Sequence, residues 1–598
     1  MNKLSLLLFC LLLSVFLSAQ QGFKPAPDSG ATPTNIDLNK LDFRLNRQRT
    51  APANLSLYPR PRLNISNVQS ITLPGVAGIR IRTDKDNGRI YAFEGRPNSL
   101  PAARPDKADA YAYLTAVATE LSLDDPESEV RITEEITDEL GQKHLRLQQV
   151  YQGLIVLPAD ARLHARTDEG FDLYTGRLQP SPQDLITTPA ISKAAARTQM
   201  RRKFEEHWIN VPPHQIDWIS GPQLEVELVV YAGGDSPTLA WYANVRPNLK
   251  EHTSLFLDAQ TGAILHENTH TCGLNEGLKN QTLGISSAPK SCLKHSGLSK
   301  SGKPSALPDG PTTASVISLY DLPVTINTFS LQDQFLLIDG TRPMFTNTGG
   351  EIDGLILSYD GLRGSPQRDD FDPNLRTSTN NQDWTQTEAS VHANAGIAYQ
   401  YFFDKFGRNS IDGNGGNVLS LMNINEMDGT RMDNAFWNGR ALFYGNGADT
   451  FYRLPRGLDV AGHEMAHGVI QATADLIYEE QPGAINESFA DIFGYLIEGE
   501  TGDHRIGEDV VTGAFPSGAL RDIRNPNNGA SSPGQRGWQP AHMDEFVNLP
   551  NTEDGDRGGV HVNSGITNRA FYLFSSNSAV GDTRAEQVYY RALNTYLT

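Results

Sequence analysis

Short alternating segments dominate the first part of the chain. Between residues 20 and 268, apolar and polar residues alternate in stretches such as 78–82 and 144–151, which Gly, Asp and Pro separate. A period of two is typical of half-buried antiparallel strands. Residues 109–121 have a wider apolar spacing, which favours a helix. We therefore expect residues 20–268 to be rich in β-strands.

The pattern changes after about Val316. Strand-like segments give way to stretches in which apolar residues recur three or four positions apart, as at 389–406, where Gly407 then marks the end of a helix. Between the two regions, residues 269–313 are rich in Gly, Ser, Lys and Pro and poor in large apolar side chains. Such a stretch favours an exposed linker, where proteolytic nicking concentrates.

The N-terminus has a third pattern. Lys3 precedes an apolar run from Leu4 to Leu17, and Ala19 follows that run. A short basic start, a brief apolar core and a small residue are typical of a signal peptide, so we expect residues 1–19 to be removed on export. A membrane-spanning helix is the alternative, but it needs roughly 20 apolar residues, and no later stretch of that length is free of charges. We expect a secreted protein without a membrane span.

Length, charge and cysteines narrow the class further. A chain of 598 residues is too long to fold around one hydrophobic core, which predicts two or more domains. The net charge of -19 argues against nucleic acid or an anionic membrane as a partner, because both would repel an acidic surface. Cys10 falls in the signal peptide, which leaves Cys272 and Cys292. These two predict either one disulfide or two free thiols, since neither has the CxxC spacing of a metal or redox site.

The strongest chemical signal is the sequence His463-Glu464-Met465-Ala466-His467. Residues four apart on a helix project from the same face, so both imidazoles can reach one ion while the glutamate points beside it. A helical histidine pair can also be purely structural. A third ligand is therefore needed to decide between the two.

Glu487 supplies that third ligand on a second predicted helix. It follows His467 by 20 positions, which allows the chain to return antiparallel to the first helix. Two histidines and one glutamate leave the fourth tetrahedral position open for water, as a catalytic zinc requires. Asp491, four residues later on the same face, can accept a hydrogen bond from the outer nitrogen of His463.

These motifs resemble the thermolysin family of secreted zinc metallopeptidases, and the likeness runs from about residue 316 to the end of the chain. Metzincins are excluded, because they need a third histidine where this chain has Thr473. The resemblance makes Glu464 the general base, which takes a proton from the zinc-bound water and gives it to the leaving amine. It implies one zinc ion with three ligands, His463, His467 and Glu487.

The resemblance extends to residues around this centre. Residues 558–565 (GGVHVNSG) are similar to the family's second histidine motif, which makes His561 a donor to the oxyanion. Asp556 would orient that histidine, and Tyr478 would be a second donor. Arg521 corresponds to the arginine that binds a substrate carbonyl. Each has a structural alternative, such as a core aromatic for Tyr478, but their joint occurrence in family order favours the catalytic interpretation.

Substrate binding follows from the same likeness. Residues 434–439 (NAFWNG) are similar to the family's edge strand, where the Asn434 side chain and the Ala435 backbone align an extended peptide by strand addition. Such a protein favours cleavage before a bulky apolar residue, because an apolar pocket removes that side chain from water. The implied pocket is lined by Phe451, Leu454, Val460, Ile506, Val510 and Leu520.

An acidic group coincides with the family's paired calcium site. Its members are Asp459, Glu498, Asp503 and Glu508, and calcium prefers such oxygen ligands. Arg505 stands where that site normally has another acid. A guanidinium would repel a second cation, so we expect one structural calcium at most. A solvated acidic face with an internal salt bridge is the alternative.

The first region resembles the propeptide of this family, chiefly at 145–163 and 255–265. Such propeptides assist folding and block the active site until they are removed. The implied fold class is α+β, a β-rich propeptide followed by a two-lobed thermolysin-like catalytic domain. The expected divisions are a signal peptide (1–19), a propeptide (20–268), a linker with the maturation cleavage (269–313), a β-rich lobe (314–460) and a helical lobe (461–598), which is incomplete where the chain stops.

The function that this likeness implies is a secreted zinc endopeptidase made as a zymogen. Its partners would be protein or peptide substrates and its own propeptide as an inhibitor. A catalytically silent binding protein is one alternative, but it would have lost Glu464 or a zinc ligand, and all four are present. A zinc aminopeptidase is another, but it would need a site for a free amine, whereas the edge strand and propeptide favour internal cleavage.

Overall fold

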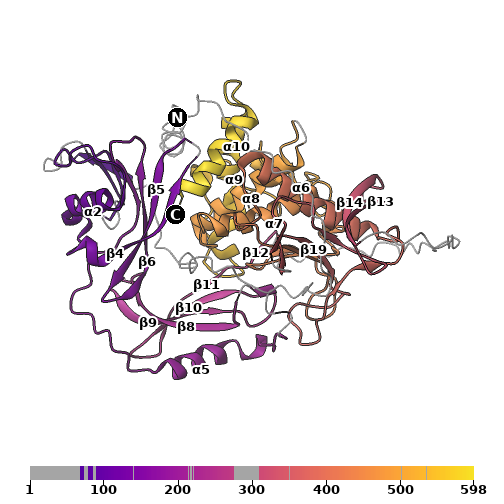
Figure 1. Cartoon of the computed structure of the whole chain (residues 1–598), viewed down its shortest axis with the longest axis horizontal. Coiled ribbons are helices and arrows are strands. Elements are labelled where there is room, and N and C mark those ends of the chain that lie inside the picture. Colours follow the sequence, from indigo (N-terminus) through magenta and orange to yellow (C-terminus); the bar gives the residue numbers. More distant parts are fainter. Residues whose placement is uncertain are drawn as a thin grey trace.

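The computed structural model describes residues 68–72, 79–84, 89–138, 140–212, 215, 218–219, 221–274, 309–348, 351–499, 502–531, 533 and 535–597. The predicted signal peptide, Cys292 with its predicted disulfide, and residues 275–308 of the predicted linker lie outside this range. The described chain forms two bodies that lie side by side (Figure 1). We call residues 68–269 the N-terminal body, 310–597 the C-terminal body and 270–274 the inserted segment.

One mixed sheet of eleven strands forms the N-terminal body, in the order β1-β2-β3-β7-β6-β8-β9-β10-β11, with β5 also paired to β6 and β4 to β5. Its pairs are antiparallel except for β6 with β8, which are parallel at Val156 and Leu157. The antiparallel strands agree with the alternating pattern. In chain order the strands are β1 (Val68–Thr72), β2 (Arg80–Asp84), β3 (Ile90–Glu94), β4 (Val130–Thr137), β5 (Lys143–Tyr151), β6 (Leu154–Ala165), β7 (Leu173–Gly176), β8 (Leu224–Tyr231), β9 (Thr238–Val245), β10 (Thr253–Asp258) and β11 (Ile264–Thr269).

Helices cover parts of this sheet. The predicted helix at 109–121 is interrupted, because Val117 leaves the helical conformation with φ -115° and ψ 11°. Residues of β5 and β6 such as Leu147 and Leu163 pack with Tyr113 of the first of these helices in one core. The helices are α2 (Lys107–Ala116), α3 (Ala118–Leu121), α4 (Pro126–Glu129) and α5 (Lys193–Lys203).

The alternation of polar and apolar residues in β5 predicts that one face of the strand is exposed to solvent, but in the structure residues on that face are buried. His144 and Gln148, on the polar face of β5, are both buried. His144 is covered by the C-terminal body, since the ring of Tyr596 packs against it with 5.7 Å between ring centroids. Gln148 is instead held within the N-terminal body, where its Nε2 donates to the Val156 carbonyl at 2.8 Å. The two bodies also meet at a second interface. There, Asn438 Nδ2 of the C-terminal body donates to the carbonyls of Trp218 and Leu249 of the N-terminal body, at 2.9 and 2.7 Å.

The C-terminal body begins with two sheets. A seven-stranded sheet has the order β12-β23-β24-β22-β19-β16, with β20 paired to β19, and a four-stranded sheet has the order β13-β14-β15-β21. Its strands are β13 (Gly310–Ile317), β14 (Pro323–Leu331), β15 (Gln334–Leu336), β16 (Ile338–Asp339), β17 (Thr346–Thr348), β18 (Glu351–Asp353), β19 (Ile356–Asp360), β20 (Asn374–Leu375), β21 (Thr377–Ser378), β22 (Val418–Ile424), β23 (Ala435–Trp437), β24 (Leu442–Gly445), β25 (Arg505–Ile506) and β26 (Arg521–Asp522). The edge strand β12 (Cys272–Gly273) comes from the inserted segment.

Long helices complete the C-terminal body. They are α6 (Gln386–Phe406), α7 (Leu458–Ala472), α8 (Glu480–Glu498), α9 (Asp556–Ser575) and α10 (Gly581–Arg591), and a π-helical turn (Ala592–Tyr596) follows. The helix α6 ends at Gly407, where the sequence predicts its end, and it begins three residues before the predicted 389, at a capping box of Thr385 with Glu388. Gly494 lets α7 and α8 approach closely, because a Cβ there would lie 2.6 Å from the Asp459 carbonyl oxygen.

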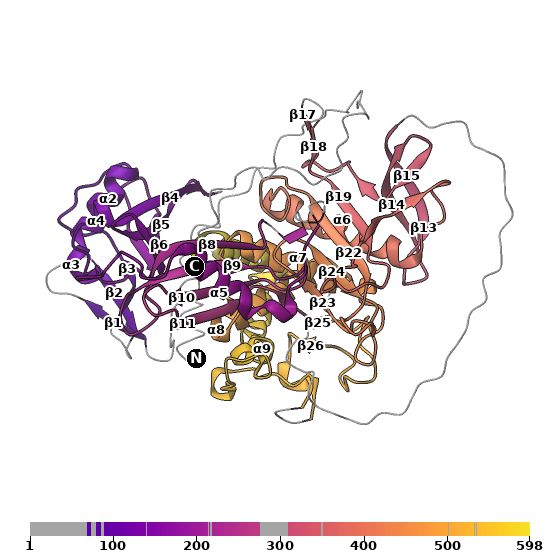
Figure 2. The same ribbon diagram turned by 90° about the horizontal axis from the view of Figure 1, so that it is seen from below.

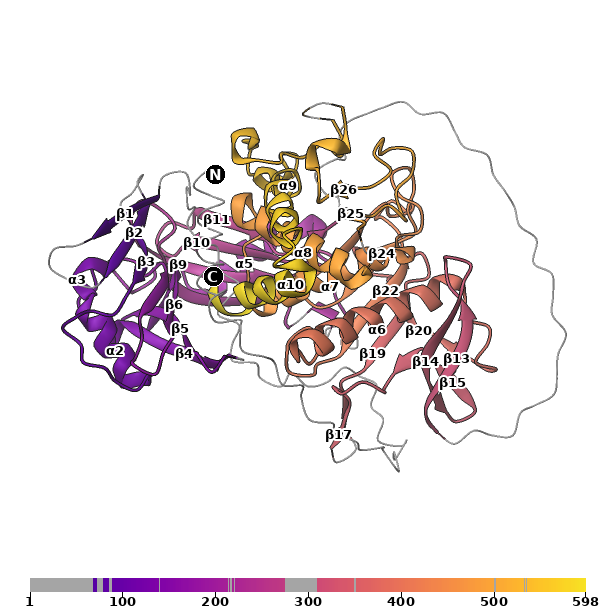
Figure 3. The ribbon, with the colours of Figure 1, turned by 90° about the horizontal axis from the view of Figure 1, so that it is seen from above.

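The views from below and above show how these parts lie. The strands β8 to β11 lie beneath the helices of the C-terminal body in Figure 1, and α5 covers the other side of these strands, in front of them in the view from below (Figure 2). The strands β1 to β7 and the sheet of β13 to β15 occupy opposite ends of the molecule (Figure 3). The predicted linker of 269–313 has strands at both described ends, since it includes β12 and the start of β13. Within the described residues, no helix is both long enough and apolar enough to cross a membrane.

Candidate metal centre and active site

The two helices α7 and α8 bring three candidate ligands together. His463 and His467 lie one turn apart on α7, and their Nε2 atoms are 3.0 Å from each other. Glu487 on α8 faces both, with 3.3 Å between its Oε1 and His467 Nε2 and 3.6 Å between its Oε2 and His463 Nε2. All three side chains are buried. The spacing in the sequence therefore leads to one convergent group in space.

The outer nitrogens of the two imidazoles are held by acceptors. His463 Nδ1 lies 3.0 Å from Asp491 Oδ1, and His467 Nδ1 lies 2.9 Å from Asn486 Oδ1. The Asn486 side chain is oriented by its Nδ2, which donates to the Leu476 carbonyl at 2.9 Å. Each Nδ1 must therefore carry its proton, because carboxylate and amide oxygens only accept. Both Nε2 atoms are left as unprotonated lone pairs that face the same point.

This donor set fits a zinc ion. Two facing lone pairs and a carboxylate need a cation between them, and two histidines with one glutamate are ligands that zinc prefers. Burial and the neighbouring His467 lower the pKa of His463 to about 4, which keeps its imidazole neutral and able to bind a metal. Burial acts to raise the pKa of Glu487, but His561 and His467 outweigh it and hold the pKa well below 4.5. Glu464, between the two histidines in sequence, is also buried.

The helix α9 contributes the second histidine motif. Arg557, Gly558 and Gly559 have positive φ values of 49°, 84° and 84°, which turn the chain so that Asp556 folds back onto the helix start. The Oδ1 of Asp556 lies 2.5 Å from His561 Nδ1, and its Oδ2 accepts the His561 backbone N–H at 2.9 Å. The sequence order of aspartate and histidine thus becomes a direct hydrogen bond.

His561 donates from both ring nitrogens. Its Nε2 lies 2.6 Å from the carbonyl oxygen of Gly273, which can only accept, just as Asp556 accepts at the other nitrogen. Burial lowers the pKa of His561, but Glu487 and Asp556 outweigh it and raise the pKa to about 10. His561 is therefore a cationic donor aimed at a backbone carbonyl.

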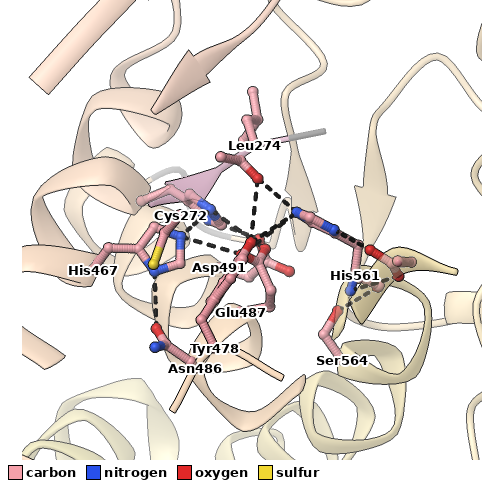
Figure 4. A network of polar contacts seen from close by, with 12 residues as sticks. Cys272, Leu274, His467, Tyr478, Asn486, Glu487, Asp491, His561 and Ser564 are labelled. Atoms are coloured by element: carbon pink, nitrogen blue, oxygen red, sulfur yellow. Dashed lines mark hydrogen bonds and ion pairs between the residues drawn. The ribbon is translucent and has the colours of Figure 1, made fainter. Parts of the chain in front are cut away.

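Tyr478 faces the same carbonyl. Its hydroxyl donates to Glu487 Oε1 at 2.5 Å and lies 3.4 Å from the Gly273 oxygen and 3.1 Å from His561 Nε2. Figure 4 shows Tyr478, Glu487 and His561 pointing toward the segment that carries Cys272 and Leu274. The structure thus brings the predicted oxyanion donors and the predicted metal ligands into one place.

Arg521 on β26 ties the centre to the inserted segment. Its Nε donates to Asp491 Oδ1 at 2.9 Å, and its Nη1 donates to the Leu274 carbonyl at 3.2 Å. Asp491 also accepts from Asn568 Nδ2 at 2.8 Å. The aspartate therefore holds both His463 and Arg521, which links the histidine orientation to the binding of a peptide carbonyl.

The inserted segment lies on β23 as an added antiparallel strand. Cys272 pairs with Trp437 and Gly273 with Phe436, and the Leu274 N–H donates to the Ala435 carbonyl at 3.0 Å. The Ala435 backbone is thus placed where the sequence expects it. The Asn434 side chain is buried, and within the described residues its Oδ1 accepts no hydrogen bond.

The Leu274 side chain is completely buried. It belongs to the same apolar cluster as all six residues expected to line the pocket. These are Phe451, Leu454, Val460, Ile506, Val510 and Leu520. Leu274 and the six expected pocket residues are therefore parts of one apolar core, which extends through the C-terminal body.

The predicted calcium residues separate into two groups. Asp459, Glu498 and Glu508 place one carboxylate oxygen each within 4.8 Å of the others. Asp503 instead forms an ion pair with Arg505, with 2.6 Å between Oδ2 and Nη2. Burial, and secondly the neighbouring Asp459, raises the pKa of Glu508 to about 8. The described group of three is smaller than the four that the sequence suggests.

Three features of the centre were not foreseen from sequence. Asn486 and Asn568 orient His467 and Asp491, and the inserted segment contacts the centre through the Gly273 carbonyl, 2.6 Å from His561 Nε2. Asn486 directly precedes Glu487, so its position beside a candidate ligand was the available signal. The inserted segment has no alternating pattern, and the sequence offers no sign that it forms a strand.

Comparisons with known proteins agree with this geometry. Residues 313–471 match the thermolysin metallopeptidase catalytic domain, residues 474–598 its alpha-helical domain, and residues 128–178 the fungalysin/thermolysin propeptide motif. Bacillolysin of Bacillus amyloliquefaciens is 30% identical over 537 residues, which cover 88% of this chain and 89% of that protein. The chain belongs to the thermolysin family.

Other relatives of this thermolysin-family chain are similar over shorter stretches. Neutral protease NprE of Bacillus pumilus is 38% identical over 287 residues, which cover 48% of this chain and 87% of that protein. The precursor of protealysin, a metalloproteinase from Serratia proteamaculans, is a solved structure with 30% identity and a TM-score of 0.36, covering 42% of this chain and 77% of its own.

Membership confirms the predicted fold class. A β-rich propeptide, our N-terminal body, precedes a catalytic domain and a helical domain. The protein is a metalloendopeptidase of a zinc-dependent family, and it carries the propeptide of a zymogen. The α+β architecture and the enzyme class were thus both predicted correctly.

Proposed function

We propose that this thermolysin-family enzyme is a secreted zinc endopeptidase that cleaves peptide bonds before bulky apolar residues. One observation carries the proposal, namely that the inserted segment lies in the centre as an extended peptide. Its Gly273 carbonyl faces His561, and its Leu274 side chain is buried in the apolar cluster. Secretion rests on the signal-like residues 1–19.

The chain's residues then take distinct roles. A zinc ion at His463, His467 and Glu487 would act as a Lewis acid and supply an activated water. Glu464 takes the proton of the attacking water and delivers it to the leaving amine. His561 donates a hydrogen bond to the oxygen on which negative charge develops, as it already does to the Gly273 carbonyl at 2.6 Å. Tyr478, whose hydroxyl lies 3.4 Å from that oxygen, would be the second donor once its proton turns from Glu487 toward it. Asp556 holds His561 in the donating orientation.

Substrate binding uses the backbone and two side-chain sites. Ala435 pairs with the peptide by strand addition, and Arg521 donates to the carbonyl of the residue after the cleaved bond. We assign Asn434 to the same edge strand, where a longer substrate would meet its buried amide. The apolar pocket supplies specificity, since burying a large side chain there removes it from water.

Internal cleavage is favoured over removal of a terminal residue. The inserted segment continues upstream of Gly273 into Cys272 and then into β11, so the centre accommodates chain on the amino side of the facing carbonyl. An aminopeptidase would need a binding group for a free amine close to that carbonyl. The geometry therefore supports an endopeptidase.

We also propose one structural calcium ion at Asp459, Glu498 and Glu508. Three carboxylates that crowd within 4.8 Å repel one another, and a hard cation relieves that repulsion. The Asp503–Arg505 ion pair stands beside them and disfavours a second cation. Calcium titration followed by thermal unfolding tests this, and a melting temperature that does not rise with calcium would contradict it.

Glu464→Gln is the decisive test of the catalytic proposal. The neutral amide cannot accept the proton of the attacking water, so we expect kcat/KM for a furylacryloyl peptide to fall by about 100- to 10,000-fold. The zinc content, measured by mass spectrometry, should stay at one ion per chain, since the ligands are unchanged. Phenanthroline should remove the wild-type activity and added zinc should restore it. A fully active variant, or a metal-free active wild type, would overturn the proposal.

A further inference from the structure

One face of the strands β9, β10 and β11 is polar and lies between the two bodies. Val245 of β9 and Leu255 of β10 pack with Met200 of α5 in one apolar cluster. Because side chains alternate between the two faces of a strand, the residues beside them point away from α5. That second face lies toward the helices of the C-terminal body (Figure 1). We call it the polar face, and its residues include Arg246, His252, Ser254, Asn268 and His270.

The strand register places three of these residues in one row. Thr253, the first residue of β10, pairs with the last residue of β9 and with the last residue of β11. The next positions on the three chains are therefore neighbours, and these are Arg246, His252 and His270. The His270 N–H donates to the His252 carbonyl at 2.7 Å, and 4.7 Å separates the centroids of the two rings. A guanidinium and two imidazoles thus lie side by side.

Donor groups on the polar face are buried without a hydrogen-bond partner among the described residues. This holds for both ring nitrogens of His252, for Nε2 of His270 and for Nε of Arg246. In the adjoining row Ser254 pairs with Asn268, and neither Ser254 Oγ nor Asn268 Nδ2 has a partner in the described chain. Burying such groups unpaired is unfavourable, and folded proteins pair nearly all of them. Five neighbouring side chains that share this lack point to a common ligand.

The charge on this row favours an anion as that ligand. Burial lowers the pKa of Arg246 to about 10, against Tyr242 and the exposed Glu225, so the guanidinium stays charged at neutral pH. Burial, and secondly Arg246, holds the pKa of His252 well below 6.5 and lowers that of His270 to about 3. Each imidazole is then neutral and offers one N–H. A metal ion would be repelled by the guanidinium, whereas an anion would be attracted.

The C-terminal body closes the row from the other side. A Cβ on Gly439 would lie 2.9 Å from His252 Nδ1, so the backbone of that body reaches the ring. The same Cβ would lie 3.6 Å from Gln471 Nε2, an amide donor on α7 whose Oε1 accepts from Trp437 Nε1 at 2.6 Å. The surroundings of His252 are therefore complete only when the N-terminal body is docked.

We propose that a small monovalent anion of the size of chloride binds at Arg246, His252 and His270 and joins the propeptide to the catalytic domain. One negative charge balances the one buried guanidinium, and imidazole, hydroxyl and amide groups are the donors that a halide accepts. An anion that binds only the docked form stabilises that form in proportion to its concentration. This role lies outside peptide hydrolysis, in which none of these residues takes part.

Thermal unfolding of the full-length Glu464→Gln chain is the first test. The proposed function makes this variant inactive, which keeps the propeptide attached and the chain uncut. Sodium chloride is compared with sodium gluconate at equal ionic strength, because gluconate is too large for a buried site. We expect the melting temperature to rise by roughly 3 °C when chloride exceeds its dissociation constant about tenfold, and then to level off. Equal melting temperatures in the two salts overturn the proposal.

Arg246→Gln in the same chain should abolish the chloride response. Its matched control is Arg202→Gln, because Arg202 is an exposed arginine on α5, across the same sheet from the polar face. We expect the control to keep the full response. A response of equal size in Arg246→Gln contradicts the assigned site.

Asn268→Asp is the complementary variant, since it supplies a fixed negative charge on the polar face. We expect a higher melting temperature in gluconate than the parent has, together with loss of the chloride response. A gain in stability separates this loss from simple misfolding. A chloride response that persists in Asn268→Asp, or a lower melting temperature in gluconate, contradicts the proposal.

Bromide locates the site directly. Crystals of the Glu464→Gln chain grown in sodium bromide should give an anomalous peak within hydrogen-bond distance of Arg246 Nε and of a His252 ring nitrogen. A water molecule there, which gives density without an anomalous signal, overturns the proposal, as does bromide found only at the surface. Both experiments measure stability or density and no turnover, so their outcome is separate from that of the peptidase test.

Discussion

The His463–His467 pair in the catalytic domain and the His144–His164 pair in the propeptide are built alike. In each pair the facing nitrogens are close, at 3.0 Å between Nε2 atoms and at 2.8 Å between Nδ1 atoms. In each, one histidine is held by an aspartate that also binds an arginine, Asp491 with Arg521 and Asp138 with Arg591. Both pairs are buried, so burial and pairing alone do not separate their roles.

The two pairs differ in the partners of the outer ring nitrogens, those that do not face the other histidine. Outer acceptors fix both catalytic imidazoles with unprotonated nitrogens facing inward, and Glu487 adds a third ligand. In the propeptide pair, Asp138 accepts from His144 Nε2, which leaves His144 Nδ1 to accept from His164 Nδ1.

In the propeptide pair a hydrogen bond therefore joins the two facing nitrogens, whereas in the catalytic pair both facing nitrogens are unprotonated and need a metal ion between them. The remaining His164 nitrogen, Nε2, lies 3.1 Å from the Thr175 hydroxyl. Among the described residues, no third metal-binding side chain converges on His144 and His164. The comparison teaches that a buried histidine pair becomes a metal site only when a third ligand arrives and every outer nitrogen is held by an acceptor.

Glu487→Gln should give the largest effect on this comparison. The substitution removes the anionic third ligand, which the propeptide pair lacks. Losing a hydrogen-bond acceptor of a ligating histidine can lower zinc affinity by roughly 100-fold, and losing a ligand should lower it further. Peptidase activity should be lost with it. Zinc titration with a competing chelator measures the change, and unchanged affinity would show that Glu487 is not a ligand.

Asp138→Asn should destabilise the propeptide interface without changing zinc binding. The substitution removes the charged partner of the buried Arg591 guanidinium, which costs about 3 kcal/mol. We expect earlier dissociation of the N-terminal body in urea, followed by tryptophan fluorescence of the uncut Glu464→Gln chain. Zinc content should remain at the value of the parent. A loss of zinc in this variant would remove the distinction between the two pairs.

Asp491→Asn is the matched substitution at the catalytic pair. It weakens the acceptor that orients His463, so zinc affinity should fall by roughly 10- to 100-fold. The chelator titration used for Glu487→Gln measures this effect on the same scale. If Asp491→Asn and Asp138→Asn change zinc affinity equally, then the hydrogen bond from His463 to Asp491 does not strengthen zinc binding.

Acid should weaken the propeptide pair by a smaller amount. Burial lowers the pKa of His144, and burial with His144 nearby holds the pKa of His164 well below 6.5. Below about pH 6.5 the unfolded chain binds protons that the folded chain does not, so stability present above that pH is lost as the pH falls. Each histidine contributes up to about 1.4 kcal/mol per pH unit.

Local amide exchange measures this pH effect where it arises. The opening free energy of β5 and β6 should fall with pH in the uncut Glu464→Gln chain. His164→Asn keeps a polar side chain but cannot titrate, so its opening free energy should depend less on pH. An identical pH dependence in both chains would assign the effect to other titratable groups, for example Asp138 or His144.

Local patterns in the sequence were sufficient for much of the catalytic centre. The spacing of His463 and His467 decides that both lie on one helical face, because the helical period is a property of the backbone itself. The end of α6 at Gly407 and the strands of the N-terminal body follow from equally local patterns. Family membership then followed from motifs in a fixed order. None of these conclusions needs a contact between distant residues.

Only the tertiary structure placed the inserted segment and the second histidine pair. Residues 270–274 have little strand pattern of their own, and they form β12 because β23 offers a free edge beside an apolar pocket. The sequence of β5 predicts a solvent-exposed face at His144, but His164 and Asp138 contact this residue and Tyr596 of the C-terminal body packs against its ring. Contacts between residues hundreds of positions apart carry no local periodicity. The sequence therefore determined which chemistry this chain contains, and the packing of the two bodies decided which peptide bond that chemistry faces.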